Sequence, residues 1–254
     1  MEKIAGEKAG IIKQNIPVVL GETVAETKTV FEAKAKAMQA PLQFAYDQFT
    51  VVRKETVNHK LNVEVLEAAT KNVLQYTLDL PGIYQTKNIL TVLAAVRQLQ
   101  QQNFSITEEH LQTALTATKQ INGLHGRWEV LQSHPTLVLD VGHNEDGMKH
   151  IVAQLAESNY QQLHIIIGMV KDKEIENVLA LLPTDATYYF TKAHIPRALP
   201  ETDLQQKAAT FQLNGNCFED VNAAIADALQ HATKDDLVLV CGSVFLVGEV
   251  VYTV

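Results

Sequence analysis

The sequence predicts an α/β fold whose C-terminal half is built around a parallel sheet. Short apolar runs alternate there with stretches of about ten residues that have helical spacing. Charge also separates the halves, because residues 1–126 carry a net charge of +1 and residues 127–254 one of −9. Such a step favours two units with separate surfaces. We place the boundary in the Gly-containing linker Asn122–Arg127, which predicts domains at residues 1–125 and 126–254.

The second half has the more regular pattern. Strands are expected at Thr136–Leu139, Leu163–Ile167, Thr187–Phe190, near Cys217 and at Leu237–Cys241. Helices are expected at Gly147–Glu157, Lys173–Leu182, Glu201–Thr210, Val221–His231 and Ser243–Tyr252. Because right-handed crossovers join parallel strands, these helices should cover both faces of the sheet.

The first half is less regular. Ile16–Leu20 is typical of a strand and Ala25–Gln39 of a helix. The β-rich stretches within Phe44–Leu80 have no helical spacing between them and predict an antiparallel segment. Helices should follow at Tyr84–Gln102 and at Thr107–Thr118, where Thr107 is the expected N-cap.

Composition excludes several classes of protein. A net charge of −8 argues against a nucleic-acid partner. The longest apolar runs are too short to cross a bilayer, which argues against a membrane partner. The two cysteines suit a reducing cytoplasm and are too few for a disulfide framework or a zinc site. We therefore expect a cytoplasmic protein.

No standard phosphate-binding loop occurs in these 254 residues. The sequence contains neither GxxxxGK[ST] nor a GxGxxG that follows a strand. Any nucleotide contact must therefore use other groups.

The turn after the first parallel strand carries Asp140, His143 and Asn144. Open α/β sheets bind ligands at the carboxyl ends of their strands. A carboxylate there can accept hydrogen bonds from a ribose, and a histidine can stack on a base or donate to a phosphate. The same pattern also fits a polar turn in which Asn144 only caps a helix.

Two further strand ends carry groups suited to an anion. Ser243 follows the last strand and begins a helix, where a hydroxyl and free N–H groups can bind a carboxylate or phosphate. Arg197 lies in the loop Ile195–Pro200, whose prolines stiffen it enough to aim a guanidinium. The alternatives are a helix-capping serine and a solvated surface arginine.

Two residues in the first half fit either a functional role or an ordinary helix surface. Lys8 lies in an apolar stretch, where desolvation can keep an amine neutral and reactive, or it is an exposed helix lysine. Asn88 shares a helix face with Gln85 and has groups that can contact an adenine edge, or the two form a polar helix face.

Six segments, taken together and in order, resemble folylpolyglutamate synthase/dihydrofolate synthase, a family of the Mur ligase superfamily. They are EKAGIIKxxIPVV at Glu7–Val19, QxxN at Gln85–Asn88, GRWEV at Gly126–Val130, DVGHNxxG at Asp140–Gly147, IPRALP at Ile195–Pro200 and GSVFLVGEV at Gly242–Val250. The resemblance covers essentially the whole chain. One departure is Asp140-Val-Gly, where the family more often has Asp-Gly-Ala.

The resemblance implies an ATP-dependent amide ligase with a central ATPase domain and a Rossmann-like C-terminal domain. ATP would phosphorylate a carboxylate of folate or dihydropteroate, and L-glutamate would attack the acyl phosphate. ATP and Mg²⁺ are the implied cofactors, folate or dihydropteroate and L-glutamate the implied substrates, and a monomer the implied state.

Residue roles follow from the same resemblance. Asn88 matches an adenine contact, Arg127 an arginine near the phosphates, Asp140 the ribose-binding carboxylate, and His143 its catalytic companion at the nucleotide. Lys8 matches a catalytic lysine that forms a carbamate and helps to hold Mg²⁺. The attacking glutamate must be held by its own carboxylates, which suits Arg197 and Ser243.

The missing phosphate loop sets the expectation for the chain as a whole. The family has that loop, and its Mg²⁺ ligands, upstream of the EKAGIIK segment. We therefore expect a C-terminal portion, the tail of the ATPase domain followed by the C-terminal domain, that is inactive by itself. The alternatives are part of a peptidoglycan-type Mur ligase, which the EKAGIIK and PRA elements disfavour, and a non-catalytic nucleotide-binding module.

Overall fold

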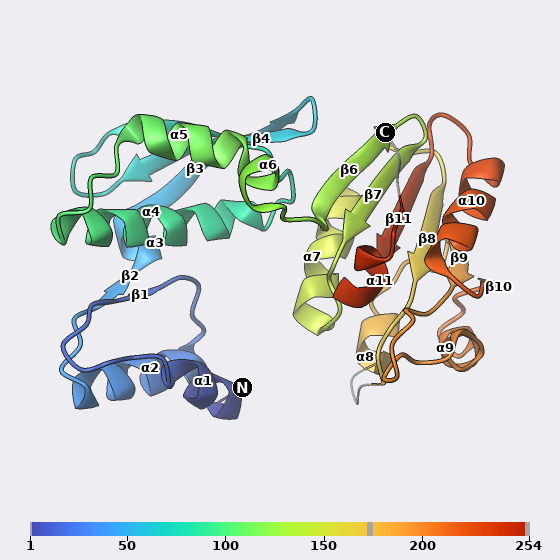
Figure 1. Ribbon diagram of the computed structural model, residues 1–254, viewed down its shortest axis with the longest axis horizontal. Helices are drawn as coiled ribbons and strands as arrows, with labels where there is room; N and C mark the ends of the chain where they lie inside the picture. The colour runs from blue at the N-terminus through green and yellow to red at the C-terminus, as the bar shows by residue number, and fades with distance from the viewer. Residues whose placement is uncertain (1, 172–174, 252–254) are drawn as a thin grey trace. The chain divides into compact units, whose positions relative to one another are not determined.

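The structure is a computed structural model that describes residues 2–171 and 175–251. The chain divides into two compact units (Figure 1). Unit 1 contains the residues up to Asp79 together with Tyr84–Ile121, and unit 2 contains Leu80–Ile83 together with the residues from Asn122 onward. Within the described ranges, no helix is both long and apolar enough to span a membrane.

Unit 2 is built on a six-stranded sheet in the order β10-β9-β8-β11-β7-β6. The strands are β6 (Arg127–Ser133), β7 (Thr136–Asp140), β8 (Leu163–Ile167), β9 (Thr187–Phe190), β10 (Gly215–Cys217) and β11 (Leu237–Cys241). All neighbours are parallel except β6, which is antiparallel to β7. The last strand in the chain, β11, therefore lies between β7 and β8.

Helices cover both faces of this sheet, as the sequence predicts. Successive residues of a strand point to opposite faces, so each central strand contributes to two cores. Ile165 and Ile167 pack with α7 (Glu145–Ala156), α8 (Ile175–Leu179) and α9 (Glu201–Ala209). Ile166 packs on the other face with α10 (Val221–His231) and α11 (Val244–Gly248). Burial on both faces explains why these strands are continuous apolar runs.

Three predictions for unit 2 need correction. The sequence places Arg127 in a linker, whereas it begins the edge strand β6. The helix predicted at Lys173–Leu182 is described only as Ile175–Leu179, and residues 172–174 lie outside the described part. The last helix ends at Gly248 rather than Tyr252, which is also outside it.

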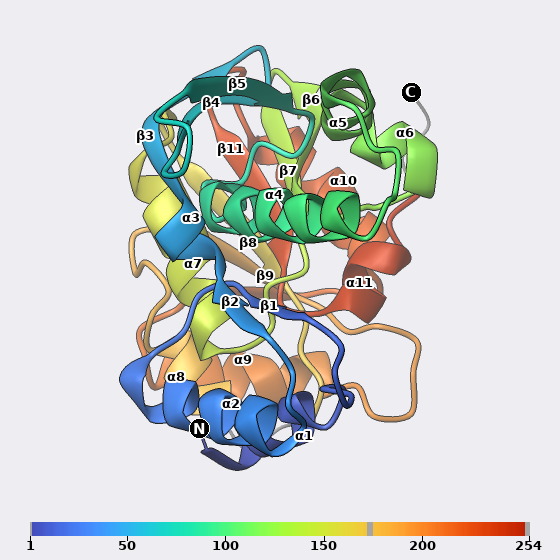
Figure 2. The ribbon, with the colours of Figure 1, turned by 90° about the vertical axis from the view of Figure 1, so that its left-hand side faces the viewer.

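Unit 1 contains two small sheets and the helices around them (Figure 2). A parallel pair, β1 (Val18–Leu20) and β2 (Leu42–Phe44), is followed by an antiparallel sheet of β3 (Phe49–Val57), β4 (Lys60–Glu67) and β5 (Val73–Leu78). The helices are α1 (Glu2–Ala9), α2 (Ala25–Ala37), α3 (Ala45–Gln48), α4 (Gln85–Gln101), α5 (Glu108–Thr116) and α6 (Thr118–Asn122).

The core of the antiparallel sheet of unit 1 lies on one face. Leu61, Val63 and Val65 alternate along β4 and pack with Ile89 and Leu93 of α4. The predicted antiparallel segment is confirmed for residues 49–78. Its start is wrong, because β2 pairs in parallel with β1 and the short helix α3 intervenes. Thr107 caps α5 as predicted, since its side chain accepts a hydrogen bond from the His110 N–H at 3.2 Å.

One histidine is buried inside the sheet of unit 2. His164 of β8 is 4% exposed, and its Nδ1 lies 3.0 Å from the Tyr189 hydroxyl. Its Nε2 lies 3.8 Å from the Asp236 carboxylate, which itself accepts the Gln162 and Thr233 N–H groups. Burial lowers the pKa of His164 below its ordinary value, although Asp236 opposes the shift and His231 adds to it.

We expect unit 2 to lose stability as the pH falls below about 6.5, the ordinary histidine pKa. The unfolded chain binds a proton there that buried His164 resists, so the unfolding free energy falls by at most about 1.4 kcal/mol per pH unit. Urea unfolding followed by fluorescence of Trp128, the single tryptophan, measures this at pH 7.5, 6.5 and 5.5. The loss should shrink in His164→Gln and persist in His134→Gln, an exposed control. An equal loss in both variants contradicts the assignment.

Candidate functional site

The turns that follow four parallel strands of unit 2 form one continuous edge, here called the carboxyl edge. It consists of residues 141–144 after β7, 168–171 after β8, 191–200 after β9, and 242–243 after β11. Backbone hydrogen bonds join these turns: the Gly242 N–H donates to the Gly142 carbonyl at 3.0 Å, and the Leu199 N–H donates to the Met169 carbonyl at 2.8 Å. The crossover that brings β11 between β7 and β8 makes this edge the expected ligand site.

Close approach at the carboxyl edge requires glycine at position 242. Gly242 has φ +101°, and a Cβ there would lie 2.7 Å from the Gly168 carbonyl oxygen. Any side chain would push the turns apart. The Gly-Ser pair of the sequence motif therefore has a backbone role in addition to its serine hydroxyl.

Asp140 is buried at the end of β7, where its carboxylate bonds two segments of backbone. Oδ1 accepts the Gly142 N–H and Oδ2 accepts the Trp128 N–H, both at 2.9 Å. Trp128 has a left-handed backbone, φ +53°, at a bulge in β6. A left-handed conformation is unfavourable for a bulky residue, so the Asp140 bond helps to hold it. The sequence pattern gave no sign of this structural role.

The sequence allows this turn to be either a ligand site or a polar turn that only caps a helix. Asn144 fits the capping interpretation, and His143 is free of that role. Asn144 caps α7, since its Oδ1 accepts the Gly147 N–H at 2.8 Å. His143 is exposed, and its Nδ1 lies 2.9 Å from the Val141 carbonyl oxygen. Because a carbonyl only accepts, Nδ1 carries the proton and Nε2 is the nitrogen available to an external group.

Arg127 lies directly across the β6–β7 ladder from Asp140. The motif around it is held by Glu129, a buried carboxylate that accepts the Gly126 N–H at 2.9 Å and lies 3.1 Å from His125 Nδ1. Glu129 is not among the residues predicted from the sequence. The sequence signal that could have indicated it is a charged residue between the apolar Trp128 and Val130.

Ser243 and Arg197 both contact α11. Ser243 is 3% exposed and caps this helix, because its Oγ accepts the Phe245 N–H at 3.2 Å. Arg197 is exposed, and its guanidinium carbon lies 4.7 Å above the centre of the Phe245 ring, a cation–π contact. The helix that begins at Ser243 thus also supports Arg197.

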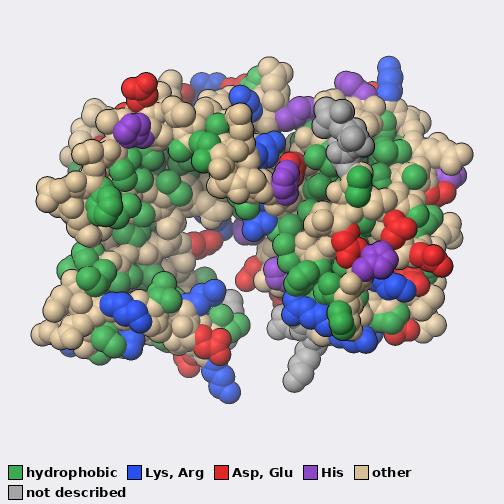
Figure 3. Space-filling view, viewed as in Figure 1, with side chains coloured by type: hydrophobic (Ala, Val, Ile, Leu, Met, Phe, Trp, Pro, Cys, Tyr) green, Lys and Arg blue, Asp and Glu red, His purple; other side chains and the backbone are tan. Residues whose placement is uncertain are grey.

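Lys8 and Asn88 belong to unit 1. Lys8 is exposed on α1, and Ile4, Ile11 and Ile16 in the same segment are exposed as well. Figure 3 shows apolar side chains, in green, on the surface of unit 1. The sequence allowed a buried, desolvated Lys8 amine, and unit 1 does not bury this amine. Asn88 is exposed on α4 and donates from Nδ2 to the buried Gln85 side chain at 2.8 Å.

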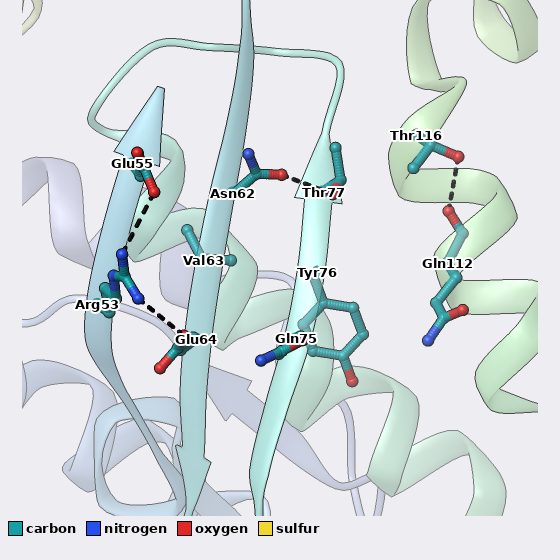
Figure 4. Close-up of a pocket in the computed structure, with 10 residues that line it drawn as sticks. All are labelled: Arg53, Glu55, Asn62, Val63, Glu64, Gln75, Tyr76, Thr77, Gln112 and Thr116. Carbon is teal, nitrogen blue, oxygen red and sulfur yellow. Dashed lines mark hydrogen bonds and ion pairs between the residues drawn. The ribbon is translucent and has the colours of Figure 1, made fainter. Parts of the chain in front are cut away.

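A cavity of about 510 Å³ on unit 1 contains none of the predicted residues. It lies over β3, β4, β5 and α5 (Figure 4). Its polar groups bond one another: Arg53 lies 3.5 Å from Glu55 and 3.7 Å from Glu64, and Thr77 donates to Asn62 at 2.7 Å. This is the solvated face of an antiparallel sheet.

Five of the seven predicted residues, namely Arg127, Asp140, His143, Arg197 and Ser243, lie at or beside the carboxyl edge of unit 2. This edge offers a buried carboxylate, an exposed imidazole, and an arginine and a serine that both contact Phe245 of α11. Over residues 2–171 and 175–251, no cluster of three or more His, Cys, Asp or Glu is suited to a metal ion.

Residues 126–244 match the family described as Mur ligase, glutamate ligase domain, so unit 2 contains a domain of the Mur ligase class. The dihydrofolate synthase/folylpolyglutamate synthase of Bacillus subtilis is 29% identical over 98% of this chain and 57% of that protein. A structure of Escherichia coli FolC in complex with DHPP and ADP is similar with a TM-score of 0.77 and 27% identity, covering 97% of this chain and 55% of that one.

A structure of Mycobacterium tuberculosis folylpolyglutamate synthase, 24% identical, shares the fold over 97% of this chain and 57% of that one, with a TM-score of 0.83. Nearly the whole chain is therefore similar to folylpolyglutamate and dihydrofolate synthases, and residues 126–244 match the Mur ligase domain model. It spans slightly more than half the length of these relatives.

Replacing Asp140 with asparagine should destabilise unit 2 by about 1–3 kcal/mol, because an amide presents one donor where the carboxylate accepts two N–H groups. Either Trp128 or Gly142 then loses its acceptor. Urea unfolding gives the free energy, and emission from Trp128, 5% exposed here, should shift to longer wavelength. The exposed Asp185→Asn is the matched control. Equal stability of the two variants would show that Asp140 has no such structural role.

Proposed function

We propose that this chain supplies the glutamate-binding site and part of the nucleotide site of a ligase that adds L-glutamate to folate or dihydropteroate. The observation that carries the proposal is the carboxyl edge of unit 2, where Ser243 caps α11, Arg197 lies over Phe245 of the same helix, and Asp140 and His143 lie at the end of β7 and in the turn after it. The similarity to Mur-type ligases supports the reaction class.

The glutamate assignment rests on charge and geometry. Glutamate has two carboxylates, and a guanidinium binds a carboxylate through two parallel hydrogen bonds. Arg197 is exposed and is supported by the Phe245 ring, which leaves the edge of its guanidinium for a ligand. A related structure, 26% identical, was solved with Mn, AMPPNP and L-glutamate bound.

The nucleotide assignments are made for each unit by itself. In unit 2 we assign Asp140 to the ribose, and His143 and Arg127 to the nucleotide and its phosphates; in unit 1 we assign Asn88 to an adenine contact. Among the related structures, the E. coli protein holds ADP and one from Yersinia pestis holds AMPPNP and a Mn ion. In this proposal His143 uses Nε2, because Nδ1 is bonded to the Val141 carbonyl.

Amide formation from a carboxylate requires a better leaving group, which an acyl phosphate supplies. We propose that the glutamate amine attacks this intermediate while Arg197 holds the glutamate carboxylate, so that the two reactants meet in a fixed geometry. Arg127 offsets negative charge at the transferred phosphoryl group. The described residues contain no cluster of three or more His, Cys, Asp or Glu that could hold a metal ion.

Replacing Arg197 with alanine should weaken L-glutamate binding to the chain about ten- to a hundredfold, the effect of losing one charge-assisted contact. Isothermal titration with L-glutamate measures it, with L-glutamine as the ligand that lacks the side-chain charge. Arg53→Ala, an exposed arginine of unit 1, is the matched control. Equal affinities for the wild type and Arg197→Ala reject the glutamate assignment.

Catalysis is tested in a hybrid, with this chain replacing the matching 57% of the B. subtilis protein. We expect glutamate-dependent ADP release from the hybrid and not from the chain alone, whose sequence has no phosphate loop. In the hybrid, Arg197→Ala should raise the KM for glutamate more than it lowers kcat. ADP binding without ligation by a folded hybrid selects the non-catalytic module instead.

Lys8 should be unmodified in the chain and carbamylated in the active hybrid. In unit 1 its amine is exposed, so the desolvated setting that favours a reactive lysine amine is absent there. Mass spectrometry after trapping in ¹³C-bicarbonate measures the label at Lys8, with the exposed Lys3 as the control. Labelled Lys8 in the chain alone contradicts this expectation.

A further inference from the structure

We propose that His194 and Glu249 form a clamp that positions the Arg197 loop for glutamate. The inference rests on the proposed function, since it assigns positioning residues to the same site. Neither residue was among the candidates from sequence, although Glu249 lies within the GSVFLVGEV segment.

The Arg197 loop, residues 191–200, is bonded to the turn after β8 along one side. The Thr191 N–H donates to the Ile167 carbonyl at 2.9 Å, and the Lys171 N–H donates to the Arg197 carbonyl at 2.9 Å. Val170 and Ala198 form an antiparallel bridge. These bonds fix the backbone at the two ends of the loop.

The other side of the loop is held by one carboxylate. Glu249 Oε1 accepts the backbone N–H of His194 at 2.6 Å, and Oε2 lies 2.8 Å from His194 Nδ1. Since a carboxylate only accepts, Nδ1 donates the second bond. Two bonds to one residue fix its backbone and its ring together, which a single surface ion pair does not do.

Glu249 is itself held in place. It is the C-cap of α11, directly after Gly248, and its N–H donates to the Leu246 carbonyl. Its carbonyl accepts from Asn222 Nδ2 at 3.0 Å, which ties it to α10. The carboxylate therefore projects from a fixed point and not from a free chain end.

One short helix thus carries three contacts to the proposed glutamate site. Ser243 begins α11, Phe245 lies under the Arg197 guanidinium, and Glu249 holds His194 three residues before that arginine. Without the clamp, His194 loses both bonds to Glu249, and the stretch up to Arg197 keeps the packing of Ile195, the backbone bond from Lys171 and the Phe245 contact. Arg197 would then sample more positions, and glutamate binding would bear the cost of ordering it.

The first test measures the loop without any ligand. Hydrogen exchange by mass spectrometry on the full chain should be faster over residues 192–197 in Glu249→Ala than in the wild type. Glu249→Gln keeps a carbonyl oxygen for the His194 N–H and should restore most of the protection. Glu176→Ala removes a carboxylate that pairs with Lys207 at 2.6 Å between α8 and α9, and it should leave the loop unchanged.

The second test titrates the same variants with L-glutamate and with ADP. Glu249→Ala should weaken glutamate binding about fivefold or more, less than direct removal of a charge-assisted contact, and leave ADP binding within about twofold. Glu249→Gln should bind glutamate within about twofold of the wild type. A double variant, Glu249→Ala with Arg197→Ala, should bind no more weakly than Arg197→Ala alone.

The outcomes separate this inference from the proposed function. Unchanged exchange in Glu249→Ala overturns the clamp. Faster exchange with unchanged glutamate affinity, while Arg197→Ala still binds weakly, overturns the positioning role alone. If Arg197→Ala also binds glutamate normally, the proposed glutamate site fails, and the positioning role fails with it.

Discussion

The carboxylate of Asp140 is the group on which the carboxyl edge of unit 2 depends. It bonds the turn that follows its own strand and, across the sheet, the left-handed Trp128 of β6. Two elements are thereby fixed by one side chain: the His143 turn and the strand that begins at Arg127. A neutral residue of the same size satisfies only one of the two N–H groups, so the charge here has a structural use.

This constraint extends along the sheet through backbone contacts between glycines. The Gly242 N–H reaches the Gly142 carbonyl, and the Gly242 Cα lies where a side chain would strike Gly168. The turns after β7, β11 and β8 therefore form one surface, and the loop after β9 joins it through Leu199. A site assembled in this way tolerates little change in its backbone, while the groups that it presents, such as His143 and Arg197, remain exposed.

Much of unit 2 was predictable from the sequence because its strands are buried on both faces. The runs at β8, β9 and β11 match their predicted bounds, since continuous apolar residues between turn signals have few other solutions. β6 was not predicted, because an edge strand with two bulges has no clear alternation of apolar and polar residues. The buried pair of His164 and Asp236 was also missed, since partners 72 residues apart leave no local signal.

The order of strands bears on how this unit is made. β11 is the last strand in the chain, yet it separates β7 from β8 and hydrogen-bonds to both. Until residues 237–241 have emerged from the ribosome, the β6–β7 hairpin and the β8–β9–β10 sheet have no ladder between them. Both therefore leave apolar edges open throughout synthesis, when contacts with other nascent chains lead to aggregation. The segment that closes the sheet is followed at once by Ser243 and α11, so the proposed glutamate site and the completed fold arise in the same final step.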